Sequence, residues 1–234
     1  MQNDLETTRR KFLKTSVAIG TFTAMAGVGL LPACSDKKGK EKDVSPPEDL
    51  MQEHGLLNRV LLIYDFCKIK LAGKESFPVA SLLDAASIIK IFVEDYHEKQ
   101  EENYLFPRFQ KANQLTDLVT VLQSQHYAGR RITGQIIQFS GQSTRTDNEN
   151  QKLIGLLTSF ITMYRPHETR EDTILFPAFR KIVSQHEYDS IGEEFEKNEH
   201  IKFGEDGFET MVSKVADIEK KLSIYDLAQF TPSF

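Results

Sequence analysis

From residue 46 onward, hydrophobic side chains recur every three or four positions, the spacing of one face of an α-helix. Strict alternation of apolar and polar residues, which indicates β-strands, is scarce. The pattern predicts four long helices, over residues 48–71, 79–111, 115–139 and 151–183, separated by turns that contain Gly, Pro, Asn or Gln. Two shorter helices are expected over residues 188–203 and 208–222. We therefore predict an all-α fold.

Each long helix carries one histidine in its hydrophobic face, and two of the helices add a glutamate one turn later. The six residues are His54, His97, Glu101, His126, His167 and Glu171. Residues four apart lie on one side of a helix, about 6 Å apart along its axis. Taken singly, a histidine in such a face is more often a hydrogen-bonded core residue, and His-x3-Glu pairs are common on helix surfaces. The metal interpretation therefore depends on all six occurring together.

The six residues lie in a sequence that is repeated. Residues 97–109 (HEKQEENYLFPRF) and 167–179 (HETREDTILFPAF) share His, Glu, Glu, Leu, Phe, Pro and Phe in the same register. The segment L-x3-H-x4-R around His54 matches the segment around His126. Two related helical hairpins predict an up-down-up-down four-helix bundle. We assign residues 48–185 to the bundle and residues 186–234 to a C-terminal helical annex that covers it.

Two prolines interrupt the second and fourth helical patterns at matching places, Pro107 and Pro177. Proline lacks a backbone donor and clashes with the preceding turn of a helix. Each is therefore expected to kink or end its helix.

Four imidazoles and two carboxylates that converge in a bundle core are donors that suit iron, manganese or zinc. Two unpaired buried carboxylates would each cost on the order of several kcal/mol, and two divalent cations would remove that cost. If Glu101 and Glu171 each bridge both ions, two histidines per ion and a bridging oxygen raise each ion to about five ligands. One position then stays open for a small molecule such as dioxygen. The absence of thiolate favours iron or manganese over structural zinc, and the second histidine of the zinc-protease pattern HExxH is missing from both copies.

These motifs resemble the hemerythrin-like (HHE cation-binding) family over roughly residues 48–183. The resemblance implies a non-haem di-iron centre in a four-helix bundle, with dioxygen binding as the best-known activity. Oxygen-carrying hemerythrins have a second histidine on the third helix, four residues from the first. Here Leu122 and Arg130 occupy those positions. The site resembles bacterial relatives with four histidines and two carboxylates, some of which are implicated in nitric-oxide stress and iron–sulfur repair.

Three functions follow from this resemblance. The first is a binding protein that takes up dioxygen or a related diatomic such as nitric oxide for sensing, storage or scavenging. The second is a redox enzyme that reduces peroxide or nitric oxide, or oxidises a substrate. The third is a metal-binding module without turnover. The sequence contains no recognisable reductase or signalling module, so it does not identify an electron donor.

Further polar residues are candidates to contact the ligands or a bound molecule. Tyr64 and Tyr104 are candidates to hydrogen-bond such a molecule, or else they fill the core. Arg59 and Arg131 are candidates to pair with carboxylates behind the ligands, or else they cap the edge of the core. The acidic neighbours of the ligands are expected on a solvated helix face: Glu98, Glu102, Glu168 and Asp172. We expect exposed side chains at His186 and His200, and a small core or boundary residue at Cys67.

The first 34 residues read as an export signal. Residues 8–14 (TRRKFLK) resemble the twin-arginine signal, and residues 31–34 (LPAC) resemble a bacterial lipobox. We therefore predict export by a twin-arginine-type route to the periplasmic or cell-surface side, with a lipid anchor at Cys34. The alternative is an uncleaved anchor with a chance arginine pair. Residues 35–47 are charged and lack periodicity, which predicts a flexible tether.

Composition narrows the class of partner. The formal net charge is −5, and the basic N-terminal segment makes the rest of the chain more acidic still. Nucleic-acid binding requires a basic surface, so we exclude that class. Two cysteines in 234 residues provide no disulfide framework.

Overall fold

The computed structural model describes residues 44–232, which form helices and no strand. The first helix, α2 (Pro46–Ala72), begins two residues before the predicted start, within the expected tether. Ser45 explains this difference, because its side chain accepts a hydrogen bond from the Glu48 backbone while the Glu48 side chain accepts one from the Ser45 backbone. Proline suits the first turn of a helix, where no backbone donor is needed.

The second long helix of the bundle is continuous but changes its hydrogen-bonding register. It comprises α3 (Val79–Ile88), η1 (Ile89–His97), α4 (Glu98–Gln100), η2 (Glu101–Leu105) and α5 (Phe106–Ala112). The segments η1 and η2 are π-helical. Asn113 ends the helix in the left-handed conformation, with φ of 51°.

The third and fourth helices follow the same plan. The third is α6 (Thr116–Ser140). The fourth comprises α7 (Asp147–Arg170), a π-helical turn η3 (Glu171–Leu175) and α8 (Phe176–Ile182). Thr146 and Glu149 form a second capping box at its start.

Pro107 and Pro177 do not end their helices. Each is the second residue of an α-helical segment that follows a π-helical turn. In these turns the Phe106 N–H donates to the Glu101 carbonyl, and the Phe176 N–H donates to the Glu171 carbonyl, five residues back. Of the two predicted outcomes, an end at the proline is therefore wrong, because a single wide turn before each proline lets the helix continue.

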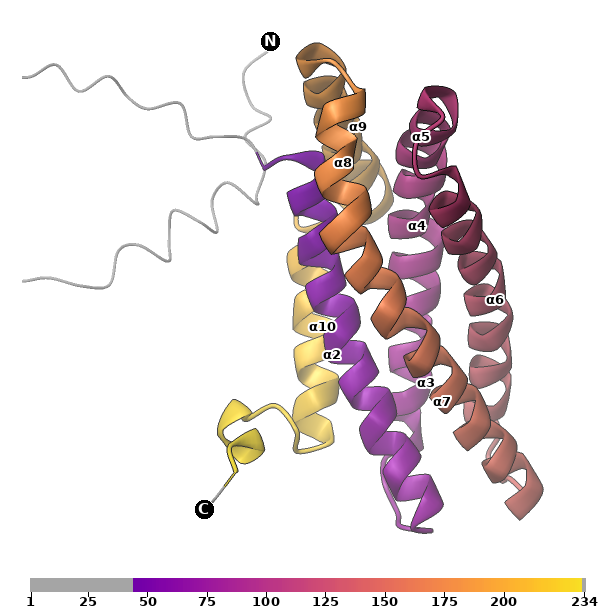
Figure 1. Cartoon of the computed structure of the whole chain (residues 1–234). Coiled ribbons are helices and arrows are strands. Elements are labelled where there is room, and N and C mark those ends of the chain that lie inside the picture. The colour runs from indigo at the N-terminus through magenta and orange to yellow at the C-terminus, as the bar shows by residue number, and fades with distance from the viewer. Residues whose placement is uncertain (1–43, 233–234) are drawn as a thin grey trace, which may run out of the picture. The chain divides into compact units, whose positions relative to one another are not determined.

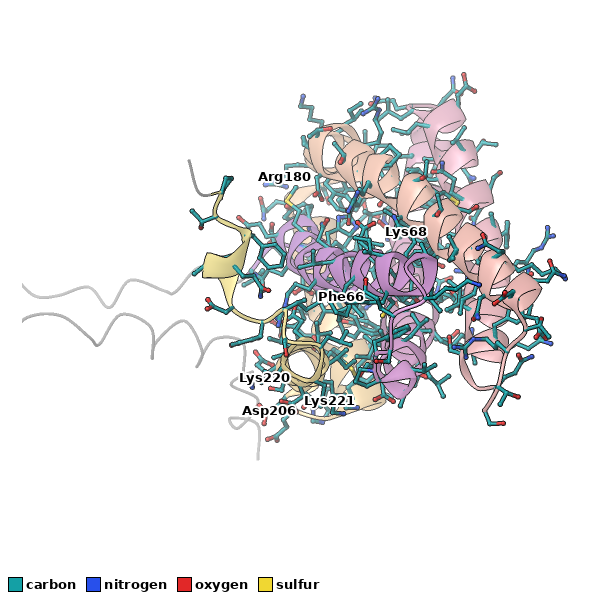
Figure 2. All side chains as sticks on the ribbon, turned by 90° about the horizontal axis from the view of Figure 1, so that it is seen from below. Phe66, Lys68, Arg180, Asp206, Lys220 and Lys221 are labelled. Atoms are coloured by element: carbon teal, nitrogen blue, oxygen red, sulfur yellow. The ribbon has the colours of Figure 1, made fainter. Side chains whose placement is uncertain are left out.

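The four long helices form a closed ring in which α2 packs on α7, α7 on α6, α6 on α3, and α3 on α2. Figure 1 shows them running alternately up and down, as predicted for a four-helix bundle. The annex helices α9 (Gln185–Phe203) and α10 (Gly207–Lys221) pack against each other, and both contact α2. The view from below shows α10 beside α2, with Lys220 and Lys221 near its end (Figure 2). Within residues 44–232, no helix is long and apolar enough to cross a membrane.

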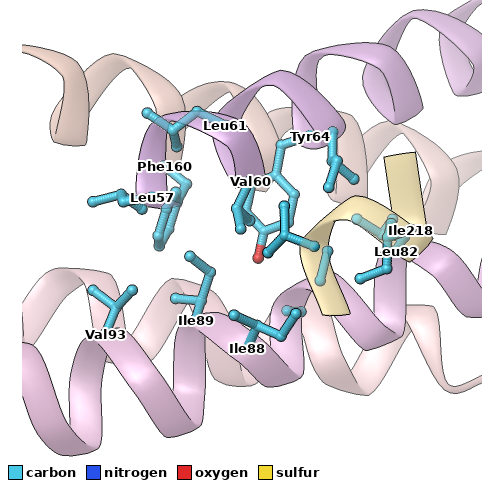
Figure 3. Close-up of a cluster of buried hydrophobic side chains, with 14 of the residues drawn as sticks. Leu57, Val60, Leu61, Tyr64, Leu82, Ile88, Ile89, Val93, Phe160 and Ile218 are labelled. Atoms are coloured by element: carbon cyan, nitrogen blue, oxygen red, sulfur yellow. The ribbon is translucent and has the colours of Figure 1, made fainter. Parts of the chain in front are cut away.

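The core consists of two hydrophobic clusters. The larger cluster joins α2, α3, η1, α6, α7 and α10, and includes Leu57, Tyr64, Ile89 and Phe160 (Figure 3). The smaller cluster contains phenylalanines of α5, α8 and α9. Along every bundle helix, the predicted ligand positions fall between members of the two clusters. The bundle therefore contains a polar layer with apolar side chains on both sides.

Candidate metal centre

The structure brings all six predicted ligand residues into this polar layer. Each exposes at most 4% of its surface. They come from all four helices of the bundle: His54, His97, Glu101, His126, His167 and Glu171.

The four imidazoles meet as two pairs. The Nε2 atoms of His54 and His97 lie 3.1 Å apart, and those of His126 and His167 lie 3.2 Å apart. Each pair joins one histidine from the first helix of a hairpin to one from the second. Two Nε2 atoms directed at one point form a nitrogen donor pair for a cation.

The two carboxylates connect the pairs. The Glu171 Oε2 atom lies 3.4 Å from the Nε2 of His54 and 3.2 Å from that of His167. The Glu101 Oε2 atom lies 3.8 Å from the Nε2 of His97 and 3.4 Å from that of His126. Each carboxylate therefore approaches one imidazole of each pair, which is the geometry of a bridging ligand.

The carboxylates lack other partners within the described part of the chain. None of the four oxygens of Glu101 and Glu171 accepts a hydrogen bond, although both side chains are fully buried. Unsatisfied buried carboxylates are costly unless charge compensates them. Two groups of donors with ligand atoms within 4.8 Å of one another surround these oxygens and share Glu101. This donor set is suited to cations.

Each imidazole also forms a hydrogen bond through Nδ1, the nitrogen that points away from the histidine pair. The Nδ1 N–H groups donate to side-chain oxygens at 2.7–3.1 Å: His54 to Asp172, His97 to Glu53, His126 to Glu102 and His167 to Gln125. Such hydrogen bonds fix the tautomer that leaves Nε2 free for a metal. Sequence reasoning did not assign this role to any of the four oxygen-bearing residues. A signal was present, because Glu53 and Gln125 directly precede a ligand histidine, while Glu102 and Asp172 directly follow a ligand glutamate.

The repeated Leu-Phe-Pro motif supplies an aromatic lining. Phe176 stacks on His54, and Phe106 stacks on His126, each with ring centroids 5.5 Å apart. Both phenylalanines directly follow a π-helical turn. Each hairpin thus places a ring against a ligand imidazole of the other hairpin.

The comparisons with known proteins agree with this geometry. Residues 45–179 match the Hemerythrin HHE cation binding domain. The chain belongs to this family. An uncharacterized protein of Mycobacterium bovis and two uncharacterized proteins from strains of Mycobacterium tuberculosis are each 43% identical to it over 221 residues, covering 89% of this chain and 87% of the relative. No solved structure matches the chain significantly.

Membership of the hemerythrin HHE family, together with the buried His/Glu cluster, supports metal binding. All six clustered residues lie within the matched region. Neither position four residues from His126 provides a further ligand: Leu122 lies in the smaller hydrophobic cluster, and Arg130 forms ion pairs with Glu98 and Glu102 at 2.6 Å.

Electrostatics in this HHE site favour positive charge. Burial by itself would lower the pKa of His126, but the adjacent carboxylates of Glu101 and Glu102 outweigh burial and raise the pKa to about 10. The pKa values of His54 and His97 are also raised, because nearby carboxylates outweigh their burial. Burial and the charge of Glu171 raise the pKa of Glu101. The carboxylates of this layer therefore favour the protonated form of His54, His97 and His126.

Two of the four acidic neighbours of the ligands differ from the solvated face that was expected, while Glu102 and Asp172 are partly exposed. Glu98 and Glu168 are buried, and Glu98 accepts a hydrogen bond of 2.6 Å from the Tyr164 hydroxyl. Burial raises the pKa of Glu168 to about 7. For Glu98 and Glu168 the expectation is wrong because neighbouring helices cover them. Tyr164 of α7 and Arg130 of α6 contact Glu98, and α2 and α6 pack on α7, which carries Glu168.

The four candidate supporting residues have other contacts. Arg59 donates two hydrogen bonds to Glu219 of α10, at 3.0 and 2.6 Å, and Arg131 is exposed. Tyr64 packs on Phe160 in the larger hydrophobic cluster. The Tyr104 hydroxyl accepts a hydrogen bond from Asn198 of α9. The arginine that pairs with carboxylates behind the ligands is Arg130, the neighbour of the predicted one.

The remaining residues behave as expected where they are described. His186 and His200 are exposed, and Cys67 is a buried core residue whose pKa burial raises to about 12. The export signal, Cys34 and most of the tether lie outside the described residues.

Proposed function

We propose that this hemerythrin HHE protein holds two iron ions and binds dioxygen or a related diatomic, such as nitric oxide, for sensing, storage or scavenging. The observation that supports this most directly is that each buried carboxylate approaches one imidazole from each histidine pair. In the proposal, His54 and His97 would hold one ion, His126 and His167 would hold the other, and Glu101 and Glu171 would provide carboxylate oxygens to both. Manganese or zinc would suit the same donors.

An open coordination position supports small-molecule binding. Two imidazole nitrogens and two carboxylate oxygens provide four donors per ion, whereas octahedral iron accepts about six. A small exogenous molecule could then complete the coordination of an ion held by these residues. Ferrous iron held there would supply the redox chemistry on which binding of dioxygen or nitric oxide depends. The hydrophobic clusters on both sides of the layer limit the access of water.

Anaerobic loading with ferrous iron tests this function. We expect two irons per chain and an absorption band that appears on addition of dioxygen or nitric oxide and disappears when the gas is removed. Irreversible oxidation with turnover of peroxide or nitric oxide would instead favour the redox enzyme. Tight zinc binding without any spectral response to iron and gas would favour a metal-binding module.

The ligand assignment has its own test. His97→Ala or Glu171→Ala should reduce the metal content to well below two per chain, because each removes a donor from the buried layer. His186→Ala and His200→Ala are matched controls, since both histidines are exposed, and they should retain the wild-type content. Two irons per chain in either ligand variant would contradict the assignment.

We also propose that the protein is exported and anchored by a lipid on Cys34, on the strength of the arginine pair and the Leu-Pro-Ala-Cys motif. Cys34→Ala should move the protein from the membrane fraction to the soluble fraction. Replacement of Arg9 and Arg10 by lysine should leave it in the cytoplasm. An unchanged distribution in both variants would contradict the proposal.

A further inference from the structure

The two histidine pairs are supported by unequal charges. The Glu53 carboxylate lies 2.8 Å from the Nδ1 of His97, whereas the Gln125 amide oxygen lies 2.9 Å from the Nδ1 of His167. Glu53 and Gln125 occupy equivalent places in the repeat, each directly before the first ligand histidine of its hairpin. The hydrogen bond is kept in both hairpins, but only one acceptor carries a charge.

The acceptors behind the other two histidines, His54 and His126, also differ in effective negative charge. Asp172 lies 2.7 Å from the Nδ1 of His54, and Glu102 lies 3.1 Å from that of His126. Glu102 also forms ion pairs with Lys99 at 2.5 Å and with Arg130 at 2.6 Å. Arg130 also pairs with Glu98, the second carboxylate near His126. Two basic side chains, Lys99 and Arg130, therefore oppose the two carboxylates behind His126. The His126–His167 pair has less negative charge behind it than the His54–His97 pair has.

The charge of such an acceptor affects metal affinity. A carboxylate that accepts the Nδ1–H of a ligand imidazole makes the imidazole a stronger donor and compensates the charge of the cation. This interaction is strengthened by burial, and Glu53 is 2% exposed whereas Gln125 is only half-buried. Both differences favour a cation bound by His54 and His97.

We propose that the two metal positions are unequal: the His54–His97 position binds its cation more tightly and fills first, and Gln125 weakens the His126–His167 position. The proposal rests on the two-cation centre proposed above. It identifies Glu53 and Gln125 as positioning residues that set the order of loading without contacting the metal.

Titration of the metal-free full chain with Mn²⁺ tests this order. Calorimetry measures the two affinities, and electron paramagnetic resonance distinguishes one bound ion from a coupled pair. For the wild-type protein we expect two steps, about 10- to 100-fold apart, the usual effect of such supporting groups. One equivalent of Mn²⁺ should give the signal of an isolated ion. The second equivalent should give that of a coupled pair.

Two nearly isosteric substitutions exchange a charged for a neutral hydrogen-bond acceptor, or the reverse, behind one ligand histidine. Gln125→Glu should strengthen the weaker step about 10-fold and bring the two steps together. Glu53→Gln should weaken the tighter step by about 10- to 100-fold. The controls carry the same chemical changes on exposed residues: Gln135→Glu, on the same helix as Gln125, and Glu193→Gln on α9. Both should leave the two affinities unchanged.

The outcomes separate this proposal from the function on which it rests. Uptake of two cations in two unequal steps that move with both substitutions supports it. Uptake of two cations with equal affinities, or steps that neither substitution moves, overturns it and leaves the two-cation centre standing. Uptake of fewer than two cations by the wild-type protein overturns the centre itself.

Discussion

At the scale of single residues, burial rather than residue type determines the charge state of several glutamates. Glu94 in η1 is fully buried, and its oxygens accept no hydrogen bond within the described residues. The Lys90 ammonium lies 3.4 Å from one of them. Burial outweighs this attraction and raises the pKa of Glu94 to about 7 from a usual value of 4.5.

Glu94→Gln should therefore stabilise the protein in a pH-dependent way. Because the folded state holds the Glu94 proton more tightly than the unfolded state, the wild type loses stability as the pH rises from about 4.5 to about 7. Removal of the charge should recover up to about 3 kcal/mol above pH 7 and almost nothing below pH 4.5. Urea denaturation of the metal-free variant at pH 8 and pH 4.5 measures this, with the exposed Glu193→Gln as control. An equal gain at both pH values would contradict it.

Gly129 is required by the size of Tyr164. A Cβ atom at Gly129 would lie 2.3 Å from the Tyr164 hydroxyl oxygen and 2.9 Å from its ring. This tyrosine also packs on the ligand His167, with ring centroids 5.4 Å apart. The glycine therefore makes room for a side chain next to the polar layer.

Gly129→Ala should destabilise the protein by about 1–3 kcal/mol through overpacking. Gly134→Ala is its control on the same helix, because a Cβ atom there meets nothing within 4 Å and alanine favours the helix by up to about 1 kcal/mol. Tyr164→Phe removes the closest atom and should rescue part of the loss. Thermal unfolding of Gly129→Ala, Tyr164→Phe and the double variant measures this coupling. Equal effects of Gly129→Ala and Gly134→Ala on stability would refute the prediction.

At the scale of elements, a π-helical turn begins at the glutamate of each His-x3-Glu motif. An extra residue in the turn rotates everything that follows it relative to a regular α-helix. The rotation brings Phe106 and Phe176 against the imidazoles of His126 and His54. The repeated proline is compatible with the π-helical turn because each proline lies in the α-helical segment that follows the turn.

Besides the hydrophobic clusters, the pair of Arg59 on α2 and Glu219 on α10 connects the annex to the bundle. Glu219 is 4% exposed, so Arg59→Ala would leave a buried carboxylate without this partner. We expect the free energy of unfolding to fall by about 1–3 kcal/mol, which is less than for a fully buried pair because the arginine is partly exposed. We also expect Arg59→Ala to speed amide hydrogen exchange in α10 relative to the wild type, and to do so more than in α6.

Lys220→Ala is the control for the annex, because its pair with Asp217 is solvent-exposed and such pairs contribute little. Equal exchange rates for α10 in both variants would show that the Arg59–Glu219 pair does not hold the annex.

At the scale of the whole molecule, we expect metal binding and folding to be coupled, because the candidate ligands come from all four bundle helices. A cation that binds only the folded state at 100 times its dissociation constant adds about 2.7 kcal/mol of stability. Removal of metal by a chelator should lower the unfolding temperature, and re-addition of metal should restore it. Glu171→Ala should lose most of this metal-dependent shift, while His200→Ala should retain it. A shift of wild-type size in the Glu171 variant would contradict the coupling.

The sequence by itself determined the fold class and the set of converging residues. Helical periodicity identifies the buried face of each helix, and the duplicated hairpin predicts that the four histidines and two glutamates converge in the core. These features depend on residues near one another in the chain or on the repeat, so they can be read without a structure.

Only the tertiary structure decided which residue supports which ligand, where the π-helical turns fall, and that Glu98 and Glu168 are buried. Asp172 reaches His54 from 118 positions away along the chain, and Arg130 rather than Arg131 faces the carboxylates. Such contacts depend on how each helix is rotated about its axis and packed on its neighbours. A rotation of one residue, about 100°, exchanges a buried side chain for an exposed one, and periodicity alone does not specify it.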